Sequence, residues 1–100
     1  MAMMQHEFGH ILQYRKIGAY AYWHVIAPES LTSAAFSSYV EHGKFWTETW
    51  ANYLSKGYFG RDWMGGKYGY PVKQISSFNM IRLLFVRNIG LMNTYPHGCF

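Results

Sequence analysis

The sequence predicts a mainly α-helical fold, a small single domain over residues 1–100 with a loop-rich C-terminal half and little or no sheet. Apolar side chains recur at helical spacing in several stretches that end at glycine, which is typical of helices with glycine caps. Half of the 100 residues are hydrophobic and a fifth are aromatic, whereas only 14% are charged. This composition provides apolar surface for one core and argues against a disordered chain.

The first helix is expected over Ala2–Ile17, with Gly18 ending it. Four apolar side chains share one broad face of this helix: Met4, Phe8, Ile11 and Leu12. Its polar side comprises Gln5, Gly9, Gln13 and Lys16. A glycine inside a helix costs roughly 1 kcal/mol relative to alanine. Gly9 is therefore either a tolerated glycine or a place where another backbone passes close to the helix.

The next part of the chain is less regular. Periodicity does not decide between strand and helix for the apolar stretch Ala19–Ala27. Pro28–Ser30 is expected to break the chain direction and to provide an N-cap for a short helix over Leu31–Tyr39. His42-Gly43 is expected to form a turn.

A second well-marked helix is expected over Phe45–Lys56, stopping at Gly57, with Glu48 and Asn52 on its polar side. The C-terminal half should begin with a glycine-rich, aromatic loop over Tyr58–Val72. A last helix is expected over residues 77–88, with Gly90 past its end, followed by an irregular tail over residues 93–100.

The motif that carries chemistry is His6-Glu7-Phe8-Gly9-His10. On a helix, His6 and His10 project from one face and are one turn apart, so both imidazoles can hold one Zn²⁺. Glu7 beside them is placed to accept a proton from water that the metal activates. Such a pattern arises by chance in roughly one scrambled sequence per hundred of this composition, and its position in a convincing helix favours a metal site.

A hydrolytic zinc site needs a third protein ligand. The downstream candidates are His24, Glu29, Glu41, His42, Glu48, Asp62 and His97. Glu48 is favoured because it lies on the second strong helix, and Glu41-His42 is the alternative. Asn52 follows one turn after Glu48, where its side-chain oxygen can accept the second N–H of a ligand histidine.

The segment His6–Gln13, together with Thr47–Asn52, resembles the gluzincin zinc metalloproteases. In that family one helix bears the HExxH residues and a later helix bears a glutamate ligand. An acidic residue bound to a ligand histidine often follows four positions on. The chain is also similar to small bacterial metallopeptidase-like proteins with a Phe-Trp-Thr-Glu-x-x-Ala-Asn segment, and the resemblance covers roughly residues 3–60.

This resemblance implies that His6, His10 and Glu48 bind Zn²⁺ and that Glu7 is the general base. Asn52 occupies the position of the acidic residue that contacts a ligand histidine, and its neutral amide should make that histidine a weaker donor to the metal. The expected substrate is a peptide or protein. A tyrosine or histidine usually stabilises the oxyanion. The candidates are His24, Tyr39, Tyr95 and His97.

The family also implies a β-sheet ahead of the first zinc helix, whereas only five residues precede His6. We therefore expect a fragment, a shortened product or a minimal domain that relies on a partner. One alternative is a non-catalytic zinc-binding helical domain or remnant. Another is part of a larger, membrane-associated protease, since residues 17–40 carry a single formal charge, Glu29. The last is a helical interaction module with an accidental motif.

The charge pattern limits the classes of partner, and the cysteine content limits the disulfides that the chain can form. Nine Lys and Arg residues against five Asp and Glu residues give a net charge of +4, but the basic residues form no run, so no nucleic-acid partner is expected. The shortage of surface charge favours contact with a membrane surface or a partner protein. One cysteine, Cys99, allows no disulfide within the chain. No signal peptide is expected ahead of the motif.

Overall fold

The computed structural model describes the backbone of residues 2–99 and the side chains of residues 2–38 and 41–91. Over this backbone the chain is mainly helical and contains no strand, which confirms the predicted fold class. The elements in order are α1 (Ala2–Ile17), α2 (Ala19–Ala21), a π-helical turn η1 (Tyr22–Ile26), α3 (Ala27–Phe36), α4 (Tyr39–Gly43), α5 (Trp46–Phe59), the 3-10 turns η2 (Gly60–Asp62) and η3 (Gly65–Tyr68), and α6 (Ser77–Cys99).

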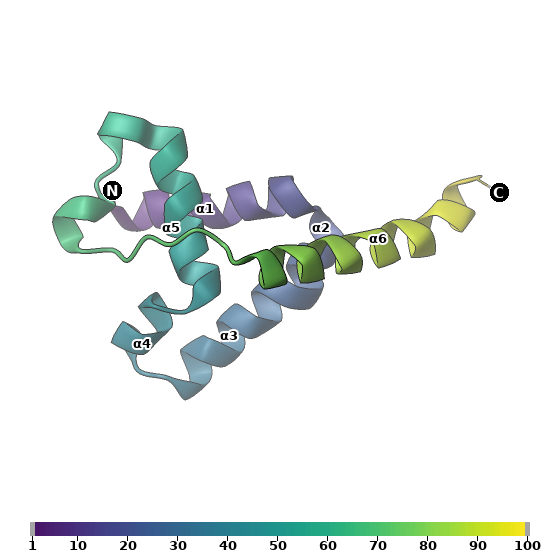
Figure 1. The fold of residues 1–100 in the computed structure, drawn as a ribbon, viewed down its shortest axis with the longest axis horizontal. Helices are drawn as coiled ribbons and strands as arrows, with labels where there is room; N and C mark the ends of the chain where they lie inside the picture. The colour runs from purple at the N-terminus through teal and green to yellow at the C-terminus, as the bar shows by residue number, and fades with distance from the viewer. Residues whose placement is uncertain (1, 100) are drawn as a thin grey trace.

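The crossing of α1 and α5 is the most extensive helix contact in the described structure (Figure 1). It is centred on Gly9, whose backbone lies against the backbone of Ala51. A Cβ atom added at Gly9 would lie 2.1 Å from the Ala51 carbonyl oxygen. Of the two sequence interpretations of Gly9, the close approach of another backbone is therefore correct.

The face of α1 that packs inward is its polar side. Gln5, Gly9 and Gln13 are buried, while Met4 and Ile11 are 69% and 52% exposed. Two of the four residues on the apolar face of α1 are therefore largely exposed. The buried glutamines are stable because they hydrogen-bond to backbone: Gln5 to residues 62 and 64, and Gln13 to the Thr47 carbonyl.

The hydrophobic core lies at the far end of α1, where α2, η1, α5 and α6 meet. Its buried members are Ile17, Ala21, Val25, Ile26, Trp50 and Leu83. Figure 1 shows α6 running alongside α2 toward the C-terminus. Gly90 permits this contact, because a Cβ atom there would lie 2.4 Å from the Tyr20 ring.

The stretch that periodicity left undecided is helical. Residues 19–36 form one continuous run, so the expected break at Pro28–Ser30 is wrong. Pro28 lies in the first turn of α3, directly after the π-helical turn. Proline lacks an N–H group, so an ordinary α-helix loses a hydrogen bond at that residue. The wider π-helical turn just before α3 accommodates this loss at Pro28.

Three predicted helix boundaries also move. Helix α5 continues through Gly57 to Phe59, because the Phe59 and Tyr58 rings pack on Phe8, and Gly60 ends it at a φ of 57°. His42 and Gly43 belong to the short helix α4. Helix α6 passes through Gly90 and runs to Cys99, so the backbone of the expected irregular tail is helical up to that residue.

Helix α5 is followed by an irregular region that contains η2 and η3, and residues 70–76 form no regular element. The Lys73 N–H donates to the Thr49 carbonyl at 3.3 Å, which holds this segment along α5. No helix within the described residues has both the length and the apolar character that crossing a membrane requires.

Candidate metal centre

Three side chains converge where α1 crosses α5. His6 and His10 come from α1, and Glu48 comes from the first turn of α5. The Nε2 atoms of His6 and His10 lie 3.0 Å and 3.2 Å from Glu48 Oε1. All three donor atoms lie within 4.8 Å of one another, so this group could hold a metal ion. In a tetrahedral zinc site with bonds of about 2.1 Å, donor atoms are roughly 3.4 Å apart, which is close to these separations.

Helix geometry places these groups together. Residues four apart on α1 lie on one face, which aligns the two imidazoles. Gly9 lies between them in sequence, and its missing side chain lets α5 approach at Ala51, one turn after Glu48. The close crossing of the two backbones therefore brings the Glu48 carboxylate within reach of both rings.

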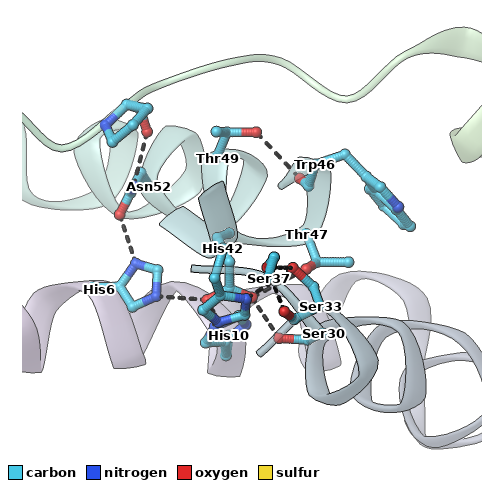
Figure 2. Close-up of polar contacts among 12 residues, drawn as sticks. His6, His10, Ser30, Ser33, Ser37, His42, Trp46, Thr47, Thr49 and Asn52 are labelled. Carbon is cyan, nitrogen blue, oxygen red and sulfur yellow. Dashed lines mark hydrogen bonds and ion pairs between the residues drawn. The ribbon is translucent and has the colours of Figure 1, made fainter. Parts of the chain in front are cut away.

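Each histidine is held at its other ring nitrogen. His6 Nδ1 donates to Asn52 Oδ1 at 2.7 Å, the contact that the sequence predicts (Figure 2). His10 Nδ1 donates to Gln13 Oε1 at 2.8 Å. In the neutral form of each ring, the proton then resides on Nδ1 and leaves the Nε2 lone pair facing Glu48, as a metal ligand requires. The sequence interpretation missed Gln13, although its position three residues after His10 on one helix is a usable signal.

Hydroxyl groups hold the other oxygen of Glu48. Ser30 Oγ and Thr47 Oγ1 donate to Oε2 at 2.5 Å and 3.0 Å. This leaves Oε1 as the atom that faces the imidazoles. Neither hydroxyl was predicted, because Ser30 reaches Glu48 only through the packing of α3 near α5, and Thr47 is one of many hydroxyl residues beside a carboxylate in the sequence.

The electrostatics of the group favour positive charge between its members. Burial by itself would lower the pKa of His6 and of His10, but hydrogen bonds to Glu48 and the charge of Glu48 outweigh it, so both pKa values are raised. Burial would raise the pKa of Glu48, but its hydrogen bonds with His10, His6 and Ser30 hold that pKa well below its usual range.

This arrangement fits a divalent cation. Each ring donates from Nδ1, so it can also donate from Nε2 to Glu48 only when it carries a second proton. Two such protons bring two positive charges next to one buried carboxylate. A divalent cation would bring the same charge and would accept the Nε2 lone pairs directly. Two imidazole nitrogens and one carboxylate oxygen form a donor set that suits zinc and several other transition metals.

Glu7, the expected general base, is exposed and follows His6 on α1. It lines a cavity of about 480 Å³ with His6, Glu48, Asn52 and Tyr70. The carboxylate is thus on the accessible side of the candidate centre. His42, the alternative ligand, lines the same cavity, and its Nε2 is 3.6 Å from Glu48 Oε1.

The other candidate residues have different roles or lie elsewhere. His24 stacks on Tyr20 and is exposed. Glu29 pairs with Arg82 at 2.7 Å and accepts from Trp46, so it joins α3 to α6 and α5. The remaining oxyanion candidates, Tyr39, Tyr95 and His97, have side chains outside the described residues.

No protein-family model, curated protein or solved structure matches the chain.

Proposed function

We propose that this chain is a zinc-dependent peptidase of the gluzincin type, with His6, His10 and Glu48 as zinc ligands. The observation that carries the proposal is the convergence of their donor atoms within 4.8 Å beside an accessible cavity that Glu7 also lines. A site with three protein ligands leaves a coordination position open for water or substrate, as hydrolysis requires.

Zinc held by these ligands supplies a Lewis acid that polarises a carbonyl group and makes water acidic near neutral pH. The protein's own contribution is to fix the ligands. Asn52 and Gln13 keep the Nε2 lone pairs of the two histidines turned toward Glu48. Ser30 and Thr47 hold the Glu48 carboxylate so that a single oxygen faces the site.

Glu7 has the role of general base. Its carboxylate accepts a proton from the attacking water, whose oxygen forms a bond to the scissile carbonyl carbon. Glu7 then gives the proton to the amide nitrogen as the C–N bond breaks. One water molecule is consumed, and the products are a carboxylic acid and an amine.

The first experiment is metal analysis of the purified protein, with zinc expected at one ion per chain. A chain that retains no transition metal even after incubation with zinc would have to be reassigned as a helical interaction module.

Two substitutions then separate binding from catalysis. Glu7→Gln should keep the bound zinc and reduce peptide hydrolysis by at least about 100-fold, the size of a general-base contribution. Glu48→Gln should release zinc, because it removes the charged ligand. Asp62→Asn, which neutralises an exposed carboxylate outside the cavity, is the matched control and should keep both properties. Hydrolysis by Glu7→Gln at the wild-type rate would exclude Glu7 as the base.

A further inference from the structure

We infer that His42 is a catalytic residue that donates a hydrogen bond from Nε2 to the carbonyl oxygen of a substrate at the candidate centre. The inference rests on the proposed function and concerns the oxygen that becomes negatively charged during hydrolysis. Such an oxygen needs a donor that is already in place.

His42 lies beside the Glu48 carboxylate and lines the cavity at the candidate centre. Its Nε2 is 3.6 Å from Glu48 Oε1, the same oxygen that His6 and His10 approach. Its side chain is 23% exposed, and it lines the cavity that Glu7 also lines. A molecule that enters this cavity and reaches Glu48 therefore meets His42 and Glu7 together.

The Nε2 atom of His42 is farther from Glu48 Oε1, at 3.6 Å, than the Nε2 atoms of His6 and His10, at 3.0 Å and 3.2 Å. Among the side chains that the structure describes, the donor atoms within 4.8 Å of one another belong to His6, His10 and Glu48, and His42 is outside this group. Histidine ligands bond to zinc at about 2.1 Å, which brings their nitrogens close together. A nitrogen next to the group but not within it is better placed to contact an oxygen that occupies the open position.

The His42 ring is also oriented. Its Nδ1 is 3.0 Å from Ser33 Oγ on α3. When the Ser33 hydroxyl donates to Nδ1, the proton of the neutral ring lies on Nε2 and faces the centre. Helix α4 holds the other end of the residue, and the Ser38 side chain caps this helix by accepting from the Glu41 N–H. The donor is therefore preorganised by two separate elements.

The test uses the cobalt-loaded full chain, because the visible absorption of Co²⁺ reports its ligands. Inorganic phosphate is the probe, as a tetrahedral anion with oxygens that resemble the charged oxygen of the reaction. The variants are His42→Ala, His42→Gln, which retains an N–H donor, and His24→Ala, an exposed histidine on η1, as the matched control.

In His42→Ala, cobalt affinity should stay within about threefold of wild type and the absorption bands should keep their positions. Phosphate affinity should fall about tenfold, because one hydrogen bond to a charged group is lost. His42→Gln should recover part of that affinity, and His24→Ala should match the wild type.

Three results would overturn the inference. A large loss of cobalt affinity in both His42 variants would make His42 a metal ligand. Unchanged phosphate affinity in His42→Ala would remove it from the substrate's surroundings. Loss of phosphate affinity in Tyr70→Phe instead would assign the donor to the tyrosine. These results are distinct from failure of the proposed function, which would appear as a wild-type chain that binds no metal or as an active Glu7→Gln variant.

Discussion

The Asn52 amide connects the candidate centre to the irregular segment beside α5. Its oxygen accepts from His6 Nδ1 at 2.7 Å, and its nitrogen donates to the Pro71 carbonyl at 2.8 Å. A flipped amide would lose both contacts. The second contact also explains why an amide suits this position. The gluzincins, which the sequence resembles, often have an acidic residue there, but an aspartate would place a second acceptor against the Pro71 carbonyl.

Removing the Asn52 side chain should therefore weaken metal binding without removing a ligand. We expect Asn52→Ala to lower zinc affinity by about 10-fold to 100-fold, because the His6 ring loses the partner that fixes its tautomer. Competition with a chromophoric chelator measures this affinity. Asn88→Ala, at an exposed position on α6, is the control and should bind zinc like the wild type. Equal affinity in the two variants would show that Asn52 does not support the ligand.

The sequence was most informative where spacing on one helix determines position. The pair His6 and His10, and the pair Glu48 and Asn52, could be placed because residues three or four apart on a helix share a face. Ser30 and His42 could not be assigned their contacts with Glu48, because these depend on how α3 and α4 pack near α5, which no local pattern encodes. The same spacing rule could have placed Gln13 beside His10, three residues before it on α1.

At the scale of elements, the crossing of α1 and α5 is what positions the centre. The sequence identified both helices, and it gave α1 the same bounds as the structure. It did not show which face of α1 is inside, because the buried glutamines are compatible with the interior only through partners on other segments. It also ended α5 at Gly57, since the packing of Tyr58 and Phe59 on Phe8 is a tertiary contact.

A methyl group at the crossing should separate the two helices. Gly9→Ala would put Cβ 2.1 Å from the Ala51 carbonyl oxygen, and a backbone atom cannot rotate away. We expect a loss of about 1–3 kcal/mol of stability despite the better helix propensity of alanine, together with weaker zinc binding. Chemical denaturation and chelator competition measure the two effects.

Gly57→Ala is the matched control for this prediction, because that glycine lies inside α5 with no neighbouring atom within 4 Å of an added Cβ. It should leave zinc binding unchanged and add up to about 1 kcal/mol of stability. If both alanine variants bound zinc like the wild type, close contact at Gly9 would not be needed for the centre.

At the scale of the whole molecule, many large apolar side chains remain on the surface. Leu31 is 73% exposed, Phe36 86% and Phe78 74%, so exposed apolar groups occur on both α3 and α6. The low charge content of the sequence indicated such a surface. The expected contact with a membrane surface or a partner protein stays a prediction.

The stability of the metal-free protein should depend on pH through the centre. The pKa values of His6 and His10 are raised above 6.5. Their contribution to the free energy of unfolding is therefore complete below pH 6.5 and is lost as the pH rises through the raised values. The pKa of Glu48 is lowered below 4.5, so its contribution is present above pH 4.5 and is lost as the pH falls toward the lowered value. Metal-free protein should be most stable between these limits.

Thermal unfolding after chelator treatment tests this prediction. The melting temperature should fall as the pH rises from 6.5 through the raised pKa values of His6 and His10, because the two imidazoles then lose their second protons. With zinc present the trend should reverse, because protons compete with the metal for Nε2 and zinc affinity rises with pH. A metal-free melting temperature that rises over the same range would contradict the assigned directions.

The distance in sequence between the two halves of the centre affects folding as well as chemistry. An ion bound by His10 and Glu48 would close a covalent-like loop between two helices that are otherwise joined by packing and by hydrogen bonds, such as the one from Gln13 to the Thr47 carbonyl. Closing a loop of this size costs conformational entropy, which grows slowly with its length. A bound ion would thus act as a reversible cross-link, and its strongest effect should be to slow the rate at which α1 and α5 separate.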